Sequence, residues 1–242
     1  MNILEIGCGD GGNLLPFTEL GCNTTGVDLS AGRIKDAILF FEERQIKGNF
    51  IASDIFKLKG LEHKFDLIIC HDVIEHIKDK ATFLSNLPKY INPKGIIFMS
   101  FPAWQMPFGG HQQICKSKII SHFPFIHLLP APIYKGILKF GGESTGCIEE
   151  LLSIKETKTS IELFEKLYID TSMIITPKQS YFNIQSRVFV RKTTKSAIVR
   201  KFRPVLSRIM GRNTDELTFQ RIWIIIRTPV YNYFGRLDSM KR

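Results

Sequence analysis

Near the start of the chain, the residues best suited to chemistry are three glycines, Gly7, Gly9 and Gly11, each one residue apart. Glycine lets the backbone turn tightly and approach a ligand closely because it has no Cβ. The preceding residues 2–6 favour a short buried strand, and residues 12–20 favour a helix. A glycine turn between a strand and a helix is a typical ligand-binding position at the carboxyl edge of an α/β sheet.

These glycines leave the kind of ligand open. Gly7, Gly9 and Gly12 also fit the pattern GxGxxG, and Asp28 follows at a distance suitable for a ribose. On that interpretation the protein would be a Rossmann-type oxidoreductase that binds NAD(P). No group of residues that is obviously suited to hydride transfer accompanies the pattern, so the glycines alone do not decide between cofactors.

Three carboxylates stand at the ends of predicted strands. Glu5 directly precedes the glycines, where a carboxylate can meet a cationic amino-acid group. Asp28 ends the strand predicted at residues 23–28, and Asp54 follows the strand predicted at 49–53, where it can accept a hydrogen bond from an adenine amino group. Each of them could be only a loop or helix-cap residue. Their order at successive strand ends favours one shared binding site.

Histidines supply candidate proton acceptors. His71 ends the fourth predicted strand, His76 follows it, and His111 comes directly after Gly109 and Gly110. Histidine has an unperturbed pKa of about 6.5 and can act as a general base near neutral pH. The flanking glycines would let the backbone come near a ligand. We therefore expect His111 to be the general base, with His76 as a second candidate catalytic residue.

The segment after the fourth strand also has the residue types of a metal site. Asp72, Glu75 and His76 are spaced i, i+3, i+4 and can share one face of a helical turn. With His111 they could offer two carboxylates and two imidazoles to Mg²⁺ or Mn²⁺. The same residues are also ordinary polar lining of a cleft, so we assign no metal ligand from the sequence.

The elements that must position these residues alternate along the first hundred residues. Such alternation predicts an α/β fold with a doubly wound, mostly parallel sheet and helices on both faces. We expect strands at 2–6, 23–28, 49–53, 65–71 and 95–101, and helices at 12–20, 31–46 and 80–90.

The regular pattern stops at Pro102. Residues 102–146 are rich in aromatic residues, Pro and Gly and show little periodicity, so we expect an aromatic-rich insertion that forms a lid. Trp104, Phe101 and Phe108 could form the wall of an apolar pocket. His122 and His127, in the same stretch, are expected to be packing residues.

The remainder of the chain has weaker signals. We expect helices at 147–157 and from a capping box at Thr159 to Lys166, and strands at 168–176 and 219–227. Residues 195–210 form an amphipathic basic stretch, which Pro204 should interrupt.

Three motifs together resemble a known family, the class I methyltransferases that use S-adenosyl-L-methionine (SAM). They are Leu4-Glu5-Ile6-Gly7-Cys8-Gly9-Asp10-Gly11, Val27-Asp28-Leu29-Ser30 and Asp72-Val73-Ile74-Glu75-His76-Ile77, and the resemblance covers about residues 2–101. It implies a Rossmann-like fold and methyl transfer from SAM to a small-molecule acceptor, with oxygen as the expected acceptor atom. A non-catalytic partner subunit with the same fold is the other alternative.

The resemblance also implies roles for single residues. The glycines Gly7, Gly9 and Gly11 would line the methionine part of SAM, above a loop that Glu5 shapes. Asp28 would bind both ribose hydroxyls, and charge would strengthen that contact. The remaining expected contacts are Leu29, Asp54 and Ile55 with the adenine, and His71 with the methionine moiety.

The resemblance divides the chain into three expected parts. Residues 1–101 would form the SAM-binding core, residues 102–146 the lid and acceptor-binding insertion, and residues 147–242 would complete the α/β domain. Members of the family usually have a helical segment before the first strand, which covers the SAM site. Here the first strand is expected at residue 2, so either residues 102–146 supply that cover or the natural beginning of the chain is missing.

Charge and cysteine content bear on location and partners. The formal net charge is +10, and residues 177–242 hold 15 Lys and Arg against three Asp and Glu. Such a basic segment suggests a peripheral contact with an anionic membrane or simply a solvated surface. Nucleic acid is not favoured, because no Asn/Asp-Pro-Pro-Tyr motif follows the fourth strand. Five cysteines without CxxC pairs, no signal peptide and no apolar run of about 20 residues favour a cytoplasmic protein with reduced thiols.

Overall fold

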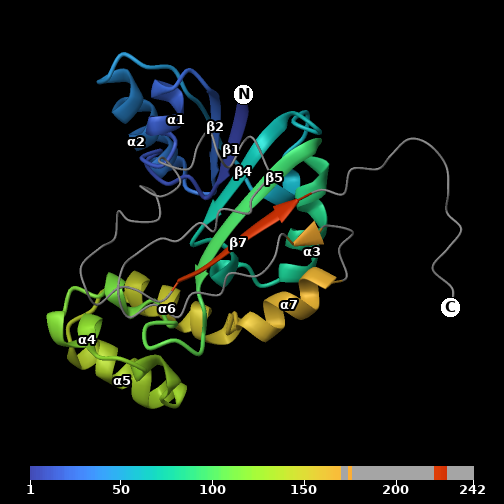
Figure 1. The fold of residues 1–242 in the computed structure, drawn as a ribbon. Helices are drawn as coiled ribbons and strands as arrows, with labels where there is room; N and C mark the ends of the chain where they lie inside the picture. Colours follow the sequence, from blue (N-terminus) through green and yellow to red (C-terminus); the bar gives the residue numbers. More distant parts are fainter. Residues whose placement is uncertain (170–173, 176–220, 228–242) are drawn as a thin grey trace, which may run out of the picture.

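The computed structural model describes residues 1–169, 174–175 and 221–227, which build a central sheet with helices packed around it (Figure 1). The sheet has the order β3-β2-β1-β4-β5-β7-β6. The first five strands in the chain pair in parallel, and β7 pairs antiparallel with β5 and with β6. The strands are β1 (Asn2–Ile6), β2 (Asn23–Asp28), β3 (Asn49–Ala52), β4 (Phe65–His71), β5 (Ile91–Pro102), β6 (Ile174–Ile175) and β7 (Arg221–Arg227).

The predicted α/β fold is therefore confirmed, with differences at the edges of elements. β5 begins at Ile91, earlier than expected, and a shift of register separates its pairing at Ile91 from its pairing at Ile96. The strand expected at 168–176 is wrong at its first two residues, because α7 continues to Ile169, and it is confirmed at Ile174–Ile175; its other residues lie outside the described part of the chain. The strand expected at 219–227 is confirmed over its described residues, Arg221–Arg227, as β7.

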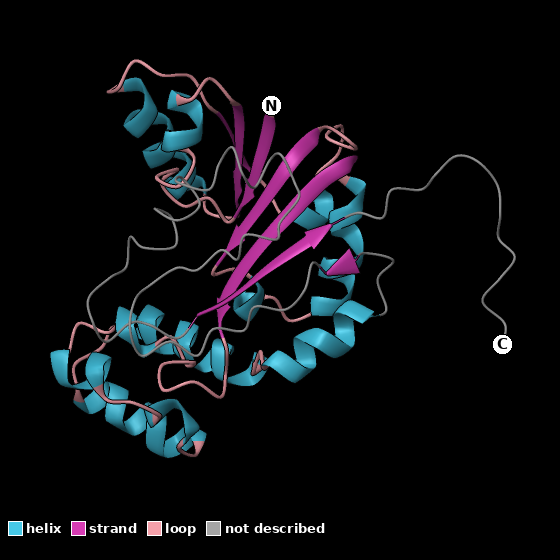
Figure 2. Ribbon diagram, viewed as in Figure 1, coloured by secondary structure: helices cyan, strands magenta, loops and turns pink. Residues whose placement is uncertain are grey.

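Seven α-helices lie among the described residues, together with five short 3-10 helices. Figure 2 shows them against the strands of the sheet. The α-helices are α1 (Leu15–Glu19), α2 (Ala31–Glu42), α3 (Lys80–Asn86), α4 (Lys118–His122), α5 (Ala131–Phe140), α6 (Thr145–Thr157) and α7 (Ile161–Ile169). The 3-10 helices are η1 (Ile55–Lys57), η2 (Ile74–His76), η3 (Leu87–Lys89), η4 (Gln112–Ile114) and η5 (Ile126–Leu128).

Alternate side chains of β1, β4 and β5 enter two separate cores, as the two-residue period of a strand requires. In β1, Leu4 belongs to the core that contains Phe83 of α3 and Phe164 of α7, whereas Ile3 belongs to the core that contains Phe17 of α1. β4 and β5 divide their side chains in the same way. The sheet is thus covered by helices on both faces, and its carboxyl edge is left to loops and 3-10 helices.

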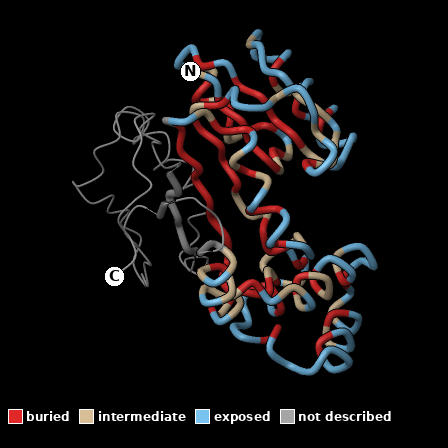
Figure 3. Tube along the Cα trace, turned by 90° about the vertical axis from the view of Figure 1, so that its right-hand side faces the viewer, coloured by how far each residue is buried: buried red, intermediate tan, exposed pale blue. Residues whose placement is uncertain are grey.

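Residues 103–157 are more regular than the sequence indicates. Residues 102–146 were expected to lack periodic structure, but they contain α4 and α5. These helices share a third core with α6, which includes Tyr134, Leu138 and Leu151. In Figure 3 this helical region lies at one end of the molecule, with buried segments inside and exposed ones outside. Its role as a lid remains a prediction.

Two details of helix capping decide where helices begin. Ser30 accepts a hydrogen bond from the backbone N–H of Arg33 and starts α2. The capping box at residues 159–162 is displaced by one position, since the side chain that accepts from the first turn of α7 is Ser160, through Leu163 N at 3.1 Å. Thr159 is instead buried, and its carbonyl oxygen accepts the backbone N–H of Trp104.

No described helix is long and apolar enough to cross a bilayer. The amphipathic stretch at 195–210 lies outside the described residues, as does most of the basic segment at 177–242.

Candidate active site

The glycine turn connects the end of β1 to the first helix and is tied to β2. Gly7, Gly9 and Gly11 have φ values of +70°, +53° and +76°, a region in which other residues are strained. Gly7 N donates to Val27 O at 2.7 Å, and Gly9 N donates to Asp28 Oδ2 at 3.0 Å. These hydrogen bonds fix the turn to β2, the strand that ends in Asp28, the residue expected to bind a ribose.

Asp28 and Asp54 lie at neighbouring strand ends. Asp28 Oδ1 also accepts from Ser30 N at 2.9 Å, so both carboxylate oxygens are oriented by backbone groups. Ser53 N donates to Asp28 O at 2.9 Å, which brings the end of β3 beside the end of β2. Asp54 Oδ1 accepts Phe56 N at 3.0 Å and caps η1. Carboxylate oxygens have further lone pairs, so both groups can still accept bonds from a ligand.

The two apolar residues expected at the adenine differ in exposure. The Leu29 side chain is 74% exposed and so is available to cover a planar ring. Ile55 is 8% exposed and belongs to the core under β3 and β4. Ile55 therefore already fills a core position, and it can meet a ligand only with its remaining exposed edge.

Glu5 is fully buried in β1 beneath the turn. Burial raises its pKa to about 8, although a hydrogen bond from Asn13 Nδ2 to its Oε1, at 2.9 Å, acts in the opposite direction. The second oxygen, Oε2, has no hydrogen-bond partner among the described residues. A buried acid of this kind joins β1 to the segment before α1, and this favours its role in shaping the loop.

β4 ends in a sharp change of direction. Asp72 has a φ of +54°, and its N–H donates to Ser100 O of β5 at 3.0 Å. Asp72 Oδ2 lies 3.4 Å from Nδ1 of His71. The turn places Val73 against the glycine loop, because a Cβ added at Gly7 would lie 2.5 Å from Val73 Cγ2. The glycine loop and the segment after β4 thus touch directly.

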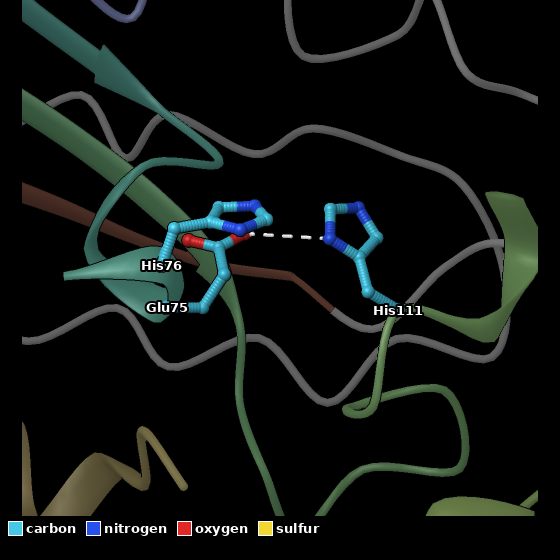
Figure 4. A group of neighbouring side chains, drawn as sticks. All are labelled: Glu75, His76 and His111. Atoms are coloured by element: carbon cyan, nitrogen blue, oxygen red, sulfur yellow. Dashed lines mark ion pairs between the residues drawn. The ribbon is translucent and has the colours of Figure 1, made fainter. Parts of the chain in front are cut away.

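Glu75, His76 and His111 come together beyond the ends of β4 and β5 (Figure 4). Their ligand atoms all lie within 4.8 Å of one another. Glu75 Oε1 is 3.8 Å from His111 Nδ1, and the two imidazole rings have centroids 5.7 Å apart. Asp72, the fourth residue considered for this group, lies beside His71 and is not one of the three residues whose ligand atoms converge. The three residues could hold a divalent metal or move a proton.

Within this group, His76 has a lowered pKa. Burial lowers the pKa of His76, and Arg33 and Lys80 lower it further, while Glu150 and Asp72 oppose that shift. A neutral His76 is therefore favoured near neutral pH, in a form that can accept a proton or bind a metal.

The loop that carries His111 is closely packed. His111 has a φ of +62°, and its N–H donates to Phe108 O at 3.0 Å. A Cβ at Gly109 would lie 2.1 Å from Ala103 O, and one at Gly110 would lie 2.1 Å from His127 Cβ. The expectation that these glycines serve ligand approach is therefore replaced by a packing role.

The aromatic residues after β5 have separate environments. Phe101 is fully buried against Phe164, with ring centroids 5.2 Å apart, so it belongs to the core rather than to a pocket wall. Trp104 meets the edge of the His127 ring at a centroid distance of 4.6 Å, and its carbonyl oxygen lies 2.9 Å from His127 Nε2. His127 is thus a packing residue, whereas His122 is exposed and lies at the end of α4.

Another group of possible metal ligands comprises Cys115, Glu143 and Cys147. Both Glu143 oxygens accept backbone N–H groups, from Lys116 at 3.0 Å and from Ser117 at 2.9 Å. Burial raises the pKa of Cys115 to about 12, which favours its protonated thiol. These contacts explain the group as the structural junction between α4 and α6.

Several residues of the site are not predicted from the sequence. Thr157 of α6 donates to the carbonyl oxygen of Glu75 at 2.5 Å, across 82 positions of chain. Lys80 is buried below Glu75, its pKa is lowered to about 8 by burial, and its Nζ donates to Ile77 O. Arg33 lies beside Gly9 and acts electrostatically on His76. Only Asn13, at the start of the first helical segment, lies near enough to a motif to have been a candidate.

Comparison with known proteins agrees with this geometry. A family model described as "Methyltransferase domain" matches residues 1–124, half of the chain. Two curated relatives are ubiquinone biosynthesis O-methyltransferases. The one from Rickettsia bellii (strain OSU 85-389) is 37% identical over 100 residues, which cover 41% of each chain. The one from Rickettsia canadensis (strain McKiel) is 35% identical and covers 41% of this chain and 42% of the relative. The match thus spans about two fifths of these relatives.

Solved structures of methyltransferases align with this chain. The plantazolicin methyltransferase BpumL, in complex with a pentazolic desmethylPZN analog and SAH, aligns with a TM-score of 0.59 and 16% identity, covering 93% of this chain and 76% of that one. PKMT2 from Rickettsia typhi, in complex with AdoHcy, aligns with a TM-score of 0.55 and 20% identity, covering 94% and 48%. At these identities the likeness shows the fold.

The family match decides between the cofactors that the glycines left open, and the NAD(P) alternative is set aside. Positive-φ glycines, strand-end carboxylates oriented by backbone N–H groups and a buried acid beneath the loop suit a ligand with ribose, adenine and amino-acid parts. The chain therefore belongs to the methyltransferase-domain family.

Proposed function

We propose that this chain is a class I SAM-dependent methyltransferase that acts on an oxygen atom of a small-molecule acceptor, with His111 as the general base. The observation that carries the proposal is the convergence of Glu75, His76 and His111 beside the glycine loop. When bound, SAM supplies a methyl group on a sulfonium, for which a hydroxyl oxygen is a suitable acceptor once its proton is removed. The name of the Rickettsia relatives, O-methyltransferases, supports oxygen as the acceptor atom.

The residues proposed to hold SAM lie along one edge of the sheet. Gly7, Gly9 and Gly11 would accommodate the amino-acid part, and Asp28 would accept the ribose hydroxyls. Asp54, with the exposed Leu29 and the edge of Ile55, would contact the adenine. His71 would lie beside the methionine moiety, since it ends β4, the strand next to β1.

The proposed proton transfer uses the pairing of His111 with Glu75. The side chain of His111 is partly exposed, at 14%, whereas Glu75 is 1% exposed and lies behind it. When the imidazole accepts the hydroxyl proton it becomes a cation, and the carboxylate 3.8 Å from Nδ1 stabilises that charge. Glu75 is held in place by the bond from Thr157 to its backbone.

Replacing His111 by Asn tests this role. Asn tolerates a positive φ and cannot accept a proton as imidazole does, so kcat should fall by about 10²- to 10⁴-fold while SAM affinity stays unchanged. Transfer of labelled methyl groups would be measured over a panel of phenols, reduced quinones and sugar nucleotides, with SAM affinity followed by calorimetry. His122→Asn, at an exposed position of α4, is the matched control.

Undiminished transfer by His111→Asn would overturn the base assignment, and an acceptor methylated only on nitrogen or carbon would overturn the choice of oxygen. EDTA separates the base from a metal role of the same residues. If His111 acts as a general base without a metal, EDTA should leave the activity unchanged. Loss of activity in EDTA that Mg²⁺ or Mn²⁺ restores, together with inactivity of Glu75→Ala, would replace the base by a metal held by Glu75, His76 and His111.

A further inference from the structure

Residues 114–140 carry an unusual concentration of exposed apolar side chains. Eight of the thirteen large hydrophobic residues that are exposed in the described part of the chain lie in this segment. Phe140 is 98% exposed, Ile119 80% and Phe123 57%. We call this the apolar cap surface, formed by Ile119, Phe123, Phe125, Leu128, Ile133 and Phe140. Isolated exposed hydrophobic residues are ordinary, but a dense group of them marks an interaction surface.

The helices of this segment have a complete core without these residues. Ile120, Tyr134 and Leu138 point inward and pack with Leu151 of α6. Tyr134 and Leu138 have no exposed surface. The outward-facing residues are therefore additional to the packing that the helices need, and their exposure is not a consequence of an unfilled core.

The charge of the segment is one-sided. No Asp or Glu occurs between Asp79 and Glu143. Four lysines, Lys116, Lys118, Lys135 and Lys139, are all exposed within or next to α4 and α5. Aromatic and aliphatic side chains mixed with lysines, without acidic residues, are typical of segments that lie in the interface of an anionic membrane.

The position of the segment permits such a contact. In Figure 1, α4 and α5 lie at the end of the molecule opposite α1 and α2. A broad surface can approach this end without meeting the first two helices. A second copy of the chain is a poorer partner, because a twofold contact would oppose the same four lysines without a carboxylate between them.

We propose that the apolar cap surface docks on an anionic lipid bilayer. Phe140, Ile119 and Phe123 would enter the boundary between headgroups and acyl chains, and Lys135 and Lys139 would lie over the lipid phosphates. This docking is independent of which acceptor atom is methylated. It is also distinct from a contact through the basic residues 177–242, since it depends on apolar side chains of α4 and α5.

Vesicle flotation with the full chain tests the proposal. Binding should require phosphatidylglycerol in phosphatidylcholine vesicles and should weaken with salt. The affinity of the double variant Ile119→Ser/Phe140→Ser for these vesicles should fall by about tenfold or more, because two large apolar side chains no longer enter the lipid. The matched control is Leu20→Ser/Leu39→Ser, which removes two exposed leucines of α1 and α2, and it should bind as the unmodified chain does.

A second measurement does not depend on a loss of function. Brominated lipids should quench tryptophan fluorescence in the F140W variant more than in L20W. Equal vesicle binding by the Ile119→Ser/Phe140→Ser variant, or absence of binding to phosphatidylglycerol vesicles at low salt, would overturn the proposal. So would a dimer in light scattering that the same double variant converts to a monomer, since the occupant would then be a second copy.

Discussion

At the scale of single residues, the acids of the site differ in what their oxygen atoms already contact. Asp28 is oriented by two backbone N–H groups and remains at the edge of the sheet, as a ligand-binding carboxylate should be. Glu5 lies in the interior and has a raised pKa. Both positions follow from the motif, but their opposite environments depend on the depth of the loop. Sequence spacing does not report that depth.

The burial of Glu5 predicts a pH dependence of stability. Its pKa in the folded protein is about 8, above the ordinary value of 4.5, because burial and the neighbouring Asp10 and Asp28 disfavour its charge. The contribution of Glu5 to the free energy of unfolding is fully present below pH 4.5. It is lost as pH rises toward 8, by up to roughly 1.4 kcal/mol per pH unit. Glu5→Gln should therefore gain stability relative to the unmodified protein as pH rises from 5 to 8.

Thermal unfolding at each pH, without SAM, measures this difference. Glu19→Gln, at the exposed end of α1, provides the control and should show no such trend. A difference between Glu5→Gln and the unmodified protein that stays constant from pH 5 to 8 would contradict the buried, protonated acid.

At the scale of elements, the glycine loop packs directly against the segment after β4. Gly7 requires both a positive φ and the absence of a Cβ next to Val73. Gly21 also has a positive φ, of +77°, but no atom lies within 4 Å of its missing Cβ. Substituting alanine at each of the two glycines therefore distinguishes the energetic cost of a positive φ from the cost of a steric contact with Val73.

Gly7→Ala should destabilise the protein more than Gly21→Ala, which carries only a conformational cost of about 1–2 kcal/mol. Adding Val73→Ala to Gly7→Ala should restore part of the loss, because it removes the atom that the new Cβ meets. Chemical denaturation measures the stabilities, and calorimetry follows SAM binding. Equal effects of the two single substitutions, with no rescue by Val73→Ala, would show that the contact does not matter.

Prediction from sequence succeeded where signals are local. The strands in the first hundred residues consist mainly of apolar residues that become buried, and the glycines and carboxylates of the site follow these strands directly in the sequence. α5 was missed because exposed Ile133 and Phe140 hide the i, i+4 spacing of its buried Tyr134 and Leu138. Thr157 could not be found, since it reaches Glu75 through the packing of α6 against η2.

At the scale of the whole molecule, β7 closes the sheet from far along the chain. It pairs antiparallel with β5 over seven residue pairs, from Ile96 with Arg227 to Pro102 with Arg221. The matching family domain ends at residue 124, so the region that completes the sheet lies beyond it. A strand that pairs with the parallel part of the sheet thus comes from residues that the family match does not include.

A chain that ends at residue 169 should aggregate, because it lacks β7 and exposes the backbone N–H and C=O groups of β5 as an open edge. A chain that ends at residue 227 keeps every described strand and should elute as the full chain does. Size-exclusion chromatography and thermal unfolding compare the two. A stable, non-aggregating product ending at residue 169 would show that β5 does not need this partner.

The left-handed backbone at Asp72 and His111 limits which residues this protein can accept at the two positions. The two residues have φ values of +54° and +62°, and they precede Glu75 and follow β5 on either side of the same site. Among side chains that do chemistry, Asn, Asp and His enter that conformation most readily. Sequence drift at these two positions is thus confined to a short list of polar residues and glycine. New acceptor specificities would have to arise by changes elsewhere on the loops, with the backbone at these two corners retained.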